Sequence, residues 1–178
     1  MSHCLDSARC PPGLLQVFDR SAIPFSLADM SVPDQPLIAI NDAFCRVTEY
    51  DADQALGRNC RFLQPAGGAG PVRERIRSFF ADASAGEARF VIPNVTRSGE
   101  PFLNIVYMTK LHHPDAEGLI LGSQFADRTG RERAAVYEEA LRADVTTLSE
   151  VVSESNWMLL GSMEAIANTS RILAQHYL

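Results

Sequence analysis

The chain has 178 residues, a hydrophobic content of 46%, an aromatic content of 8% and a formal net charge of −6 at pH 7. This length suits one domain with extensions, and the composition excludes a chain that is disordered throughout. The acidic balance argues against nonspecific binding to nucleic acid or to an anionic membrane, and no apolar run approaches the roughly 20 residues of a membrane span.

Residues 1–21 are expected to form an N-terminal helical cap. The segment Leu14–Arg20 follows a Pro-Pro-Gly sequence that can start a helix, and Leu14, Val17 and Phe18 fall on one helical face. Because a helix this short gains little stability by itself, we expect it to pack on another part of the protein.

Residues 22–128 are expected to form the central domain. Two strand-like runs, Ile23–Met30 and Pro36–Asn41, come first, and short helical segments follow, the last of them at Arg73–Ala83. Three more strand-like runs are joined by hairpin turns: Ala88–Val95, Phe102–Leu111 and Gly118–Phe125. This order predicts an α+β fold with a five-stranded antiparallel sheet, short helices on one face, and a ligand pocket between them.

Residues 129–178 are expected to form a pair of C-terminal amphipathic helices. The apolar positions of the first helix are Tyr137, Leu141, Val145, Leu148 and Val152, and a second series starts at Leu159. A segment of this size is too small for a catalytic domain but sufficient for a helical interface. Our hypothesis is a homodimer formed through these helices; the alternative is that they fold back on the sheet of their own chain.

The cysteines and histidines give no metal-binding pattern. The four cysteines include no Cys-x-x-Cys pair, and the adjacent His112 and His113 are expected on a hairpin tip, where histidines are usually solvated. We therefore expect no metal. The first residues lack the basic start and apolar stretch of a signal peptide, which favours a cytoplasmic protein with reduced thiols.

One polar cluster stands out, at Gly57–Gln64, with the sequence GRNCRFLQ. Taken alone, Cys60 could be a small buried hydrophobe and Arg61 a solvated surface charge. The neighbouring amides of Asn59 and Gln64, however, suit the edge of a heterocycle, and the planar fork of Arg61 suits a phosphate. Together these side chains describe an anionic, heteroaromatic ligand beside a thiol.

This segment resembles the flavin-binding signature of light-oxygen-voltage (LOV) photosensor domains, a branch of the PAS fold. The similarity runs from about Ile23 to Asp127 and includes the hairpin VIPNVTRSGEPFLN and the strand LILGSQF. It implies a blue-light receptor that binds FMN, with FAD or riboflavin as less favoured alternatives. It also implies a reversible cysteinyl-flavin adduct at Cys60 and signalling without enzymatic activity.

The resemblance assigns roles to eight residues. Cys60 matches the cysteine that bonds to the excited flavin, and Gln124 matches the glutamine near flavin nitrogen 5, which relays the change by turning its amide. The remaining matches are to ligand contacts: Asn59 and Gln64 for the ribityl chain or ring edge, Arg61 and Arg77 for the phosphate, and Asn94 and Asn104 for the pyrimidine edge. Arg73 and Arg75 are alternatives to Arg77, because the Gly-rich segment before them loosens the alignment.

The sequence departs from the family at Pro65, Pro93 and Leu103, and after Gln124, where the exit from the last strand is one residue longer. Two other functions remain open at this point. One is a light-insensitive PAS module that holds flavin for redox or protein interaction. The other is a cysteine hydrolase, which needs a base paired with Cys60. For the photoreceptor we expect light-dependent self-association and an unknown downstream regulatory protein as partners.

Overall fold

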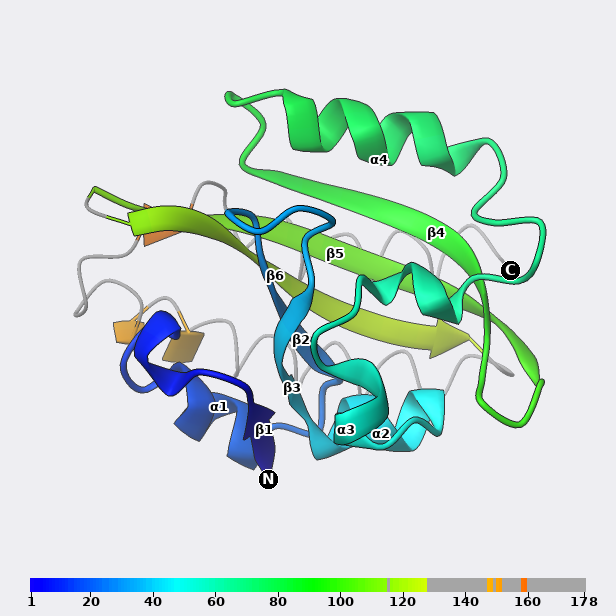
Figure 1. Ribbon diagram of the computed structural model, residues 1–178, viewed down its shortest axis with the longest axis horizontal. Helices are drawn as coiled ribbons and strands as arrows, with labels where there is room; N and C mark the ends of the chain where they lie inside the picture. The colour runs from blue at the N-terminus through cyan, green and yellow to red at the C-terminus, as the bar shows by residue number, and fades with distance from the viewer. Residues whose placement is uncertain (115, 128–146, 149, 152–157, 160–178) are drawn as a thin grey trace.

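The computed structural model describes residues 1–114, 116–127, 147–148, 150–151 and 158–159. Within these ranges the strands form one antiparallel sheet in the order β1-β3-β2-β6-β5-β4, and β7 pairs with β5 (Figure 1). The strands are β1 (Ser2–Cys4), β2 (Phe25–Asp29), β3 (Leu37–Asn41), β4 (Glu87–Val95), β5 (Pro101–His113), β6 (Ala116–Asp127) and β7 (Met158–Leu159). The helices are η1 (Ser7–Arg9), α1 (Leu14–Arg20), α2 (Asp42–Thr48), α3 (Ala52–Ala55), η2 (Cys60–Leu63) and α4 (Val72–Ala81), with η marking 3-10 helices.

The five predicted strands are confirmed as β2 to β6, each of five residues or more. The N-terminal helix is confirmed as α1, with the bounds Leu14–Arg20. The structure adds β1, which pairs with β3, in a segment predicted to be helical. Leu159 was expected at the start of a second helix, but it lies in β7. The reason is that β5 extends past the end of β4, so the edge of β5 at Leu111 and His112 is open to another strand.

The sheet has two different faces because successive side chains along a strand point to opposite sides. In β2, Phe25 and Leu27 belong to the core beneath α1, whereas Ser26 and Ala28 face the other side. The helices α2, α3 and α4 and the 3-10 helix η2 lie on the side of Ser26 (Figure 1). Helices therefore cover both faces, and the two faces carry different chemistry.

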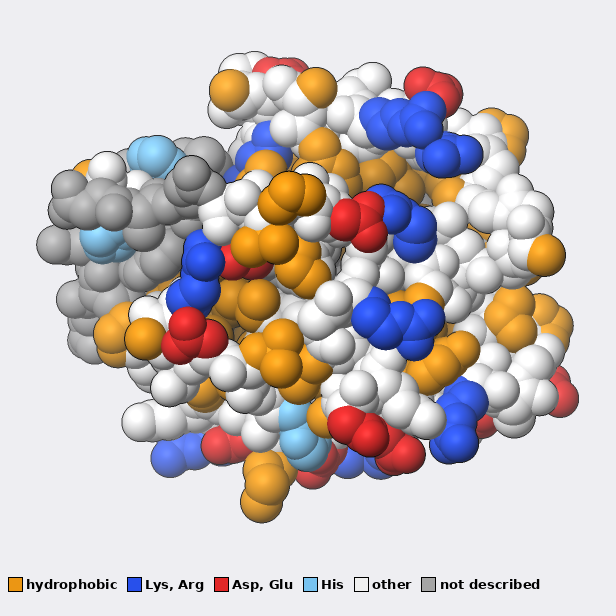
Figure 2. Space-filling model, viewed as in Figure 1, with side chains coloured by type: hydrophobic (Ala, Val, Ile, Leu, Met, Phe, Trp, Pro, Cys, Tyr) orange, Lys and Arg blue, Asp and Glu red, His pale blue; other side chains and the backbone are white. Residues whose placement is uncertain are grey.

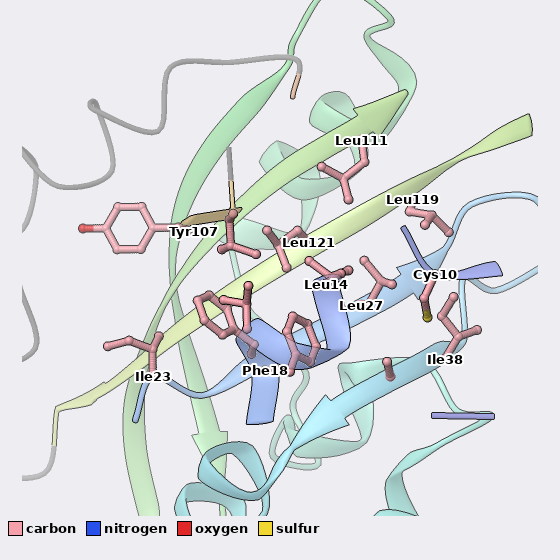
Figure 3. Packing of buried hydrophobic residues seen from close by; sticks show 14 residues of the cluster. Cys10, Leu14, Phe18, Ile23, Leu27, Ile38, Tyr107, Leu111, Leu119 and Leu121 are labelled. Atoms are coloured by element: carbon pink, nitrogen blue, oxygen red, sulfur yellow. The ribbon is translucent and has the colours of Figure 1, made fainter. Parts of the chain in front are cut away.

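The core under α1 is built mainly from apolar side chains. Leu14 and Phe18 of α1 point toward Leu27, Leu111 and Leu121 of the strands (Figure 3), as the spacing of apolar residues in this helix predicts. The rings of Phe18 and Phe25 stack with their centroids 5.3 Å apart. This packing fixes the N-terminal helix to the sheet of the same chain.

The predicted C-terminal helices lie largely outside the described residues. The four described residues of the first helix, Thr147, Leu148, Glu150 and Val151, are helical. Leu148 is completely buried in the core under α1, and Val151 packs against that core. At this position the helix contacts the outer face of its own chain's sheet.

Asn41 joins three elements. Its Oδ1 atom accepts hydrogen bonds from the backbone N–H of Phe25 in β2 (3.0 Å) and of Phe44 in α2 (3.0 Å). Its Nδ2 atom donates to the carbonyl oxygens of Ile23 (2.8 Å) and of Phe18 in α1 (3.2 Å). Asn41 is the N-cap of α2, and it is fully buried.

Lys110 fixes the end of α4. The Nζ atom of this buried β5 residue donates to the carbonyl oxygens of Phe79 (2.8 Å) and Asp82 (2.6 Å), at the C-terminal end of the helix. A cation placed there also interacts favourably with the helix dipole. In the part of the chain that is described, no helix is long and apolar enough to cross a membrane.

Candidate functional site

A cavity of about 830 Å³ lies between the inner face of the sheet and the segment from η2 to α4. All eight residues predicted from the sequence line it: Asn59, Cys60, Arg61, Gln64, Arg77, Asn94, Asn104 and Gln124. The first four come from the loop around η2, Arg77 comes from α4, and the last three come from three neighbouring strands. The structure thus gathers into one cavity residues that are up to 65 positions apart in the sequence, since 124 − 59 = 65.

A row of hydrogen-bonded polar side chains crosses the sheet wall of this cavity. Asn104 Nδ2 donates to Asn94 Oδ1 (2.8 Å) and to Gln124 Oε1 (3.2 Å). Gln124 Nε2 donates in turn to Ser26 Oγ (3.3 Å). These four residues are buried and lie on β4, β5, β6 and β2, which are adjacent in the sheet. The row therefore links four strands on one face.

Asn104 leaves one polar atom of this row without a partner. Its Oδ1 atom is buried, and it makes no hydrogen bond to any described residue. A buried acceptor without a partner is costly, so such an atom in a cavity wall indicates a ligand that carries a donor. The pyrimidine ring of a flavin has such an N–H group.

Cys60 lies in the loop wall of the cavity, at the start of η2. The N-cap of this 3-10 helix is Asn59, whose side chain accepts from the backbone N–H of Arg61. Burial raises the pKa of the Cys60 thiol above its usual value, and the nearby Arg61 guanidinium opposes this shift. Cys60 therefore rests as a neutral thiol at physiological pH rather than as a nucleophilic thiolate.

The outer end of the cavity is basic. Arg61, Arg73 and Arg77 all line it, and Figure 2 shows Lys and Arg side chains gathered over α4 and the neighbouring short helices. Arg75 is not among the lining residues; its guanidinium lies 5.7 Å from the ring centroid of Phe90. Of the arginines considered from the sequence, the structure thus places Arg73 and Arg77 at the cavity and Arg75 away from it.

Apolar side chains form the broad walls of the cavity. On the sheet side they are Ile92, Val106, Met108 and Ile120, and on the loop side Leu63. A planar heteroaromatic ligand fits such walls, with its polar edge on the amides and its anionic group on the arginines.

The comparisons with known proteins agree with this arrangement. Residues 26–130 match the family model described as a PAS domain. The chain is 34% identical over 154 residues to a blue-light-activated histidine kinase of Rhizobium johnstonii, which covers 86% of this chain and 43% of the kinase. It is 33% identical to the LOV protein of Rhodobacter sphaeroides, whose crystal structure superimposes with a TM-score of 0.63 over 92% of this chain and 89% of that one. The chain belongs to the LOV photoreceptor family.

The LOV chain spans less than half the length of the curated relatives that it matches. Phototropin-2 of Oryza sativa, for example, is 35% identical over 94 residues, which are 52% of this chain and 10% of the plant protein. The LOV domain of a blue-light-activated histidine kinase from Erythrobacter litoralis is 32% identical with a TM-score of 0.55, over 61% of this chain and 98% of that domain. The similarity to these larger proteins thus concerns their light-sensing part.

Two departures from the LOV pattern have structural explanations. Pro93 lies in β4, the edge strand of the sheet, where a residue without an N–H group is tolerated. Leu103 is 48% exposed and is not among the residues that line the cavity. After Gln124 the strand β6 continues to Asp127, so the first part of the longer exit is still strand. The residues that follow Asp127 lie outside the described part.

Sequence reasoning missed Ser26. This residue lines the cavity of the LOV chain and accepts the hydrogen bond from Gln124. A signal was present, because the predicted strand at Ile23–Met30 alternates between apolar residues and the smaller Ser26 and Ala28. That alternation assigns Ser26 to the face opposite Phe25 and Leu27.

Among the described residues, the remaining cysteines and the histidines are not part of the cavity lining. Cys4 Sγ and Cys10 Sγ are 3.2 Å apart near α1, and both are free thiols. Among the described residues no group of His, Cys, Asp and Glu side chains could hold a metal ion. No described histidine lines the cavity, so none is placed there as a general base for Cys60.

Proposed function

We propose that this LOV protein is a blue-light receptor that binds FMN and that Cys60 bonds reversibly to the flavin. The observation that carries the proposal is a neutral thiol in the same cavity as a row of buried amides, one of which has an unpaired acceptor. The receptor core corresponds to residues 22–128. FMN is favoured over riboflavin because arginines line the cavity, and a phosphate would pair with Arg61 and Arg77.

The protein has to supply only one reactive group, the Cys60 thiol. Bound flavin supplies a blue-absorbing ring whose excited state accepts a thiol at carbon 4a. Cys60 would contribute its sulfur to that carbon and its proton to nitrogen 5. The S–H bond and the π bond between carbon 4a and nitrogen 5 would break while one C–S and one N–H bond form, so no external oxidant or reductant is needed. Reversal returns the proton to Cys60. The protein's residues hold the ring, exclude water and respond to the new N–H group.

Gln124 is the residue that we expect to respond. Its side-chain amide has a donor, Nε2, and an acceptor, Oε1, and rotation about the Cγ–Cδ bond exchanges their positions. When a neighbouring acceptor gains a proton, turning the amide restores a hydrogen bond. This change begins on β6, which leads to the C-terminal part of the chain.

The visible absorption spectrum of the purified protein tests this function. We expect a flavin band that bleaches under blue light and recovers in darkness. A Cys60→Ser variant should bind flavin and show no reversible bleaching. Cys45→Ser is the matched control, because Cys45 is partly buried on α2 and does not line the cavity. Full bleaching of Cys60→Ser would refute the role of Cys60, and a wild-type spectrum insensitive to light would leave a light-insensitive PAS module.

We further propose that light changes self-association through the terminal helices, as a homodimer that signals to a separate regulatory protein. The support is the pair of amphipathic patterns in residues 129–178. At Leu148 the C-terminal segment packs on the core of its own chain, as the fold-back alternative expects at this position. Size-exclusion chromatography with light scattering, in darkness and under blue light, tests this. A monomer in both states would contradict it.

A further inference from the structure

Gln124 is bonded to β2 and to the residue directly before it. Its backbone N–H donates to the carbonyl oxygen of Pro24 (3.0 Å), next to the start of β2, and its side-chain Nε2 donates to Ser26 Oγ (3.3 Å). Both contacts are made by one residue of β6 with a strand that lies about 100 positions earlier in the sequence, since 124 − 26 = 98. The strand β2 thus receives the last hydrogen bond of the polar row that starts at Asn94.

The two partners of the Gln124 amide differ in what they can do. Asn104 Nδ2 is only a donor, so it fits the Gln124 oxygen and opposes the Gln124 nitrogen. The Ser26 hydroxyl can accept or donate, so it can bond to either end of the amide. A turned Gln124 would therefore keep a partner at Ser26, while Asn104 Nδ2 would lose its acceptor at Gln124 and keep the one at Asn94.

We propose that Ser26 is a positioning residue of the photoreceptor, which holds the Gln124 amide in its dark orientation and carries its turn into β2. This inference rests on the proposed function. The hydroxyl favours the dark orientation because without it a buried N–H of Nε2 is left unpaired, whereas the amide oxygen that takes this place after the turn can still accept from the new flavin N–H group. It remains bonded after the turn, now as donor, so that the movement of Gln124 pulls on β2.

The path beyond Ser26 is continuous. The next backbone N–H along β2 toward the N-terminus, that of Phe25, donates to Asn41 Oδ1 (3.0 Å). Asn41 Nδ2 donates to the carbonyl oxygen of Phe18 in α1 (3.2 Å). A shift of β2 at Ser26 is therefore transmitted by direct hydrogen bonds to the N-terminal helix on the opposite face.

Gly122 provides the space that the Ser26 hydroxyl occupies. It lies directly opposite Ser26 in the pairing of β2 with β6. A Cβ atom added to Gly122 would lie 2.7 Å from Ser26 Oγ, closer than real contacts allow. An alanine at this position should push the hydroxyl away from Gln124 while leaving Ser26 in place.

The test compares Ser26→Ala, which removes the hydroxyl, with Ser26→Thr, which keeps it, both in the flavin-loaded chain. Two readouts are the NMR resonance of the Gln124 side-chain amide in darkness and the rate of dark recovery after bleaching. Loss of the hydroxyl destabilises the dark orientation more than the lit one, so Ser26→Ala should shift the resonance and slow recovery about fivefold. Ser26→Thr should recover within a factor of about two of the wild type.

Gly122→Ala gives an independent check. It should reproduce the shifted resonance and slow recovery of Ser26→Ala, and in the Ser26→Ala background it should add nothing further. Flavin retention is measured for each variant, because Gly122 also lines the cavity. Additive effects of the two substitutions would overturn the inference.

The failures are distinguishable. If wild type bleaches and Ser26→Ala matches it in both readouts, Ser26 has no positioning role and the proposed function stands. If the wild type does not bleach, the proposed function is wrong, and the positioning role of Ser26 is wrong with it. If Ser26→Thr is as impaired as Ser26→Ala, the effect reflects packing, and the inference is wrong.

Discussion

Arg61, which lines the cavity, forms an ion pair with Asp34, the residue before the cavity-lining Gln35. Asn59 strengthens this arrangement, because its Nδ2 atom donates to the backbone carbonyl oxygen of Asp34. Both ionic side chains are more than half exposed. The pair places a carboxylate beside an arginine that we assign to the phosphate of FMN, so the carboxylate competes with that phosphate.

Replacing Asp34 should therefore tighten the binding of FMN. In Asp34→Asn the competing charge is gone, and asparagine tolerates the positive φ of 72° at this position. An exposed ion pair contributes at most about 1 kcal/mol, so we expect an FMN dissociation constant lower by about two- to fivefold. Fluorescence titration of the flavin-free chain measures this.

Riboflavin and a second variant provide the controls for Asp34. Riboflavin lacks the phosphate, so its affinity should not change. Asp53→Asn makes the same change of charge at an exposed residue that does not line the cavity, and it should leave both affinities unchanged. An equal gain for riboflavin and FMN would show that Asp34 does not act through the phosphate.

Lys110 should contribute to both stability and ligand retention. Lys110→Met removes the donor to the carbonyl oxygens of Phe79 and Asp82, and we expect the free energy of unfolding to fall by about 2 kcal/mol. Because α4 carries Arg77, a frayed helix end should also release FMN faster. Chemical denaturation and flavin release measure the two effects. Arg46→Met, at an exposed position on α2, is the matched control, and an equal loss there would contradict the role of Lys110.

Asn41 should be the most sensitive polar position outside the cavity. Asn41→Ala removes a helix cap and leaves two N–H groups and two carbonyl groups without this partner, so we expect a loss of about 3 kcal/mol in unfolding free energy. Asp6→Ala, which removes one exposed cap bond of η1, should cost far less. Similar losses in urea denaturation for both variants would contradict the central position of Asn41.

Stability should fall at alkaline pH because of the buried thiols. Burial, and then the neighbouring Cys4, raise the pKa of Cys10 far above the ordinary value of 9.0. Below pH 9 the thiol is protonated in the folded and unfolded states, and its contribution is fully present. Above pH 9 the unfolded chain loses the proton first, so the free energy of unfolding decreases, by up to about 1.4 kcal/mol per pH unit for one thiol.

The variant Cys10→Ala isolates this effect from other titrating groups. Denaturation of the reduced protein at pH 8 and pH 10 should show a smaller decrease for Cys10→Ala than for the wild type. Cys45→Ala provides a comparison, because Cys45 is only partly buried although its pKa is also raised. Equal slopes for the wild type and Cys10→Ala would show that the Cys10 thiol titrates alike in both states.

The long elements of the fold could be predicted from the sequence because each carries its own periodic pattern. Leu14–Arg20 combines a helix start with apolar residues on one face, and its bounds are correct. The strand β1 has only three residues and β7 only two, so neither contains a period. Their existence depends on open edges of β3 and β5, which are properties of the folded sheet.

The cavity residues were found through a resemblance, and their placement in one cavity agrees with it. Ser26 was not found, because the alternation of its strand indicates only which face it occupies, while its partner Gln124 is distant in the sequence. The arginines of α4 also stayed ambiguous. Which of them reaches the cavity depends on the rotation of this helix about its axis. The turns before Val72, which include Gly68 and Gly70 with positive φ, set that rotation.

The alternation along β2 has a practical meaning for protein engineering. Ser26 touches the ligand cavity, whereas Phe25 and Leu27, its immediate neighbours, touch the packing under α1. Substitutions at Ser26 should therefore change the lifetime of the lit state from the ligand side of the sheet, whereas substitutions at Phe25 and Leu27 should change how firmly α1 packs on the other side.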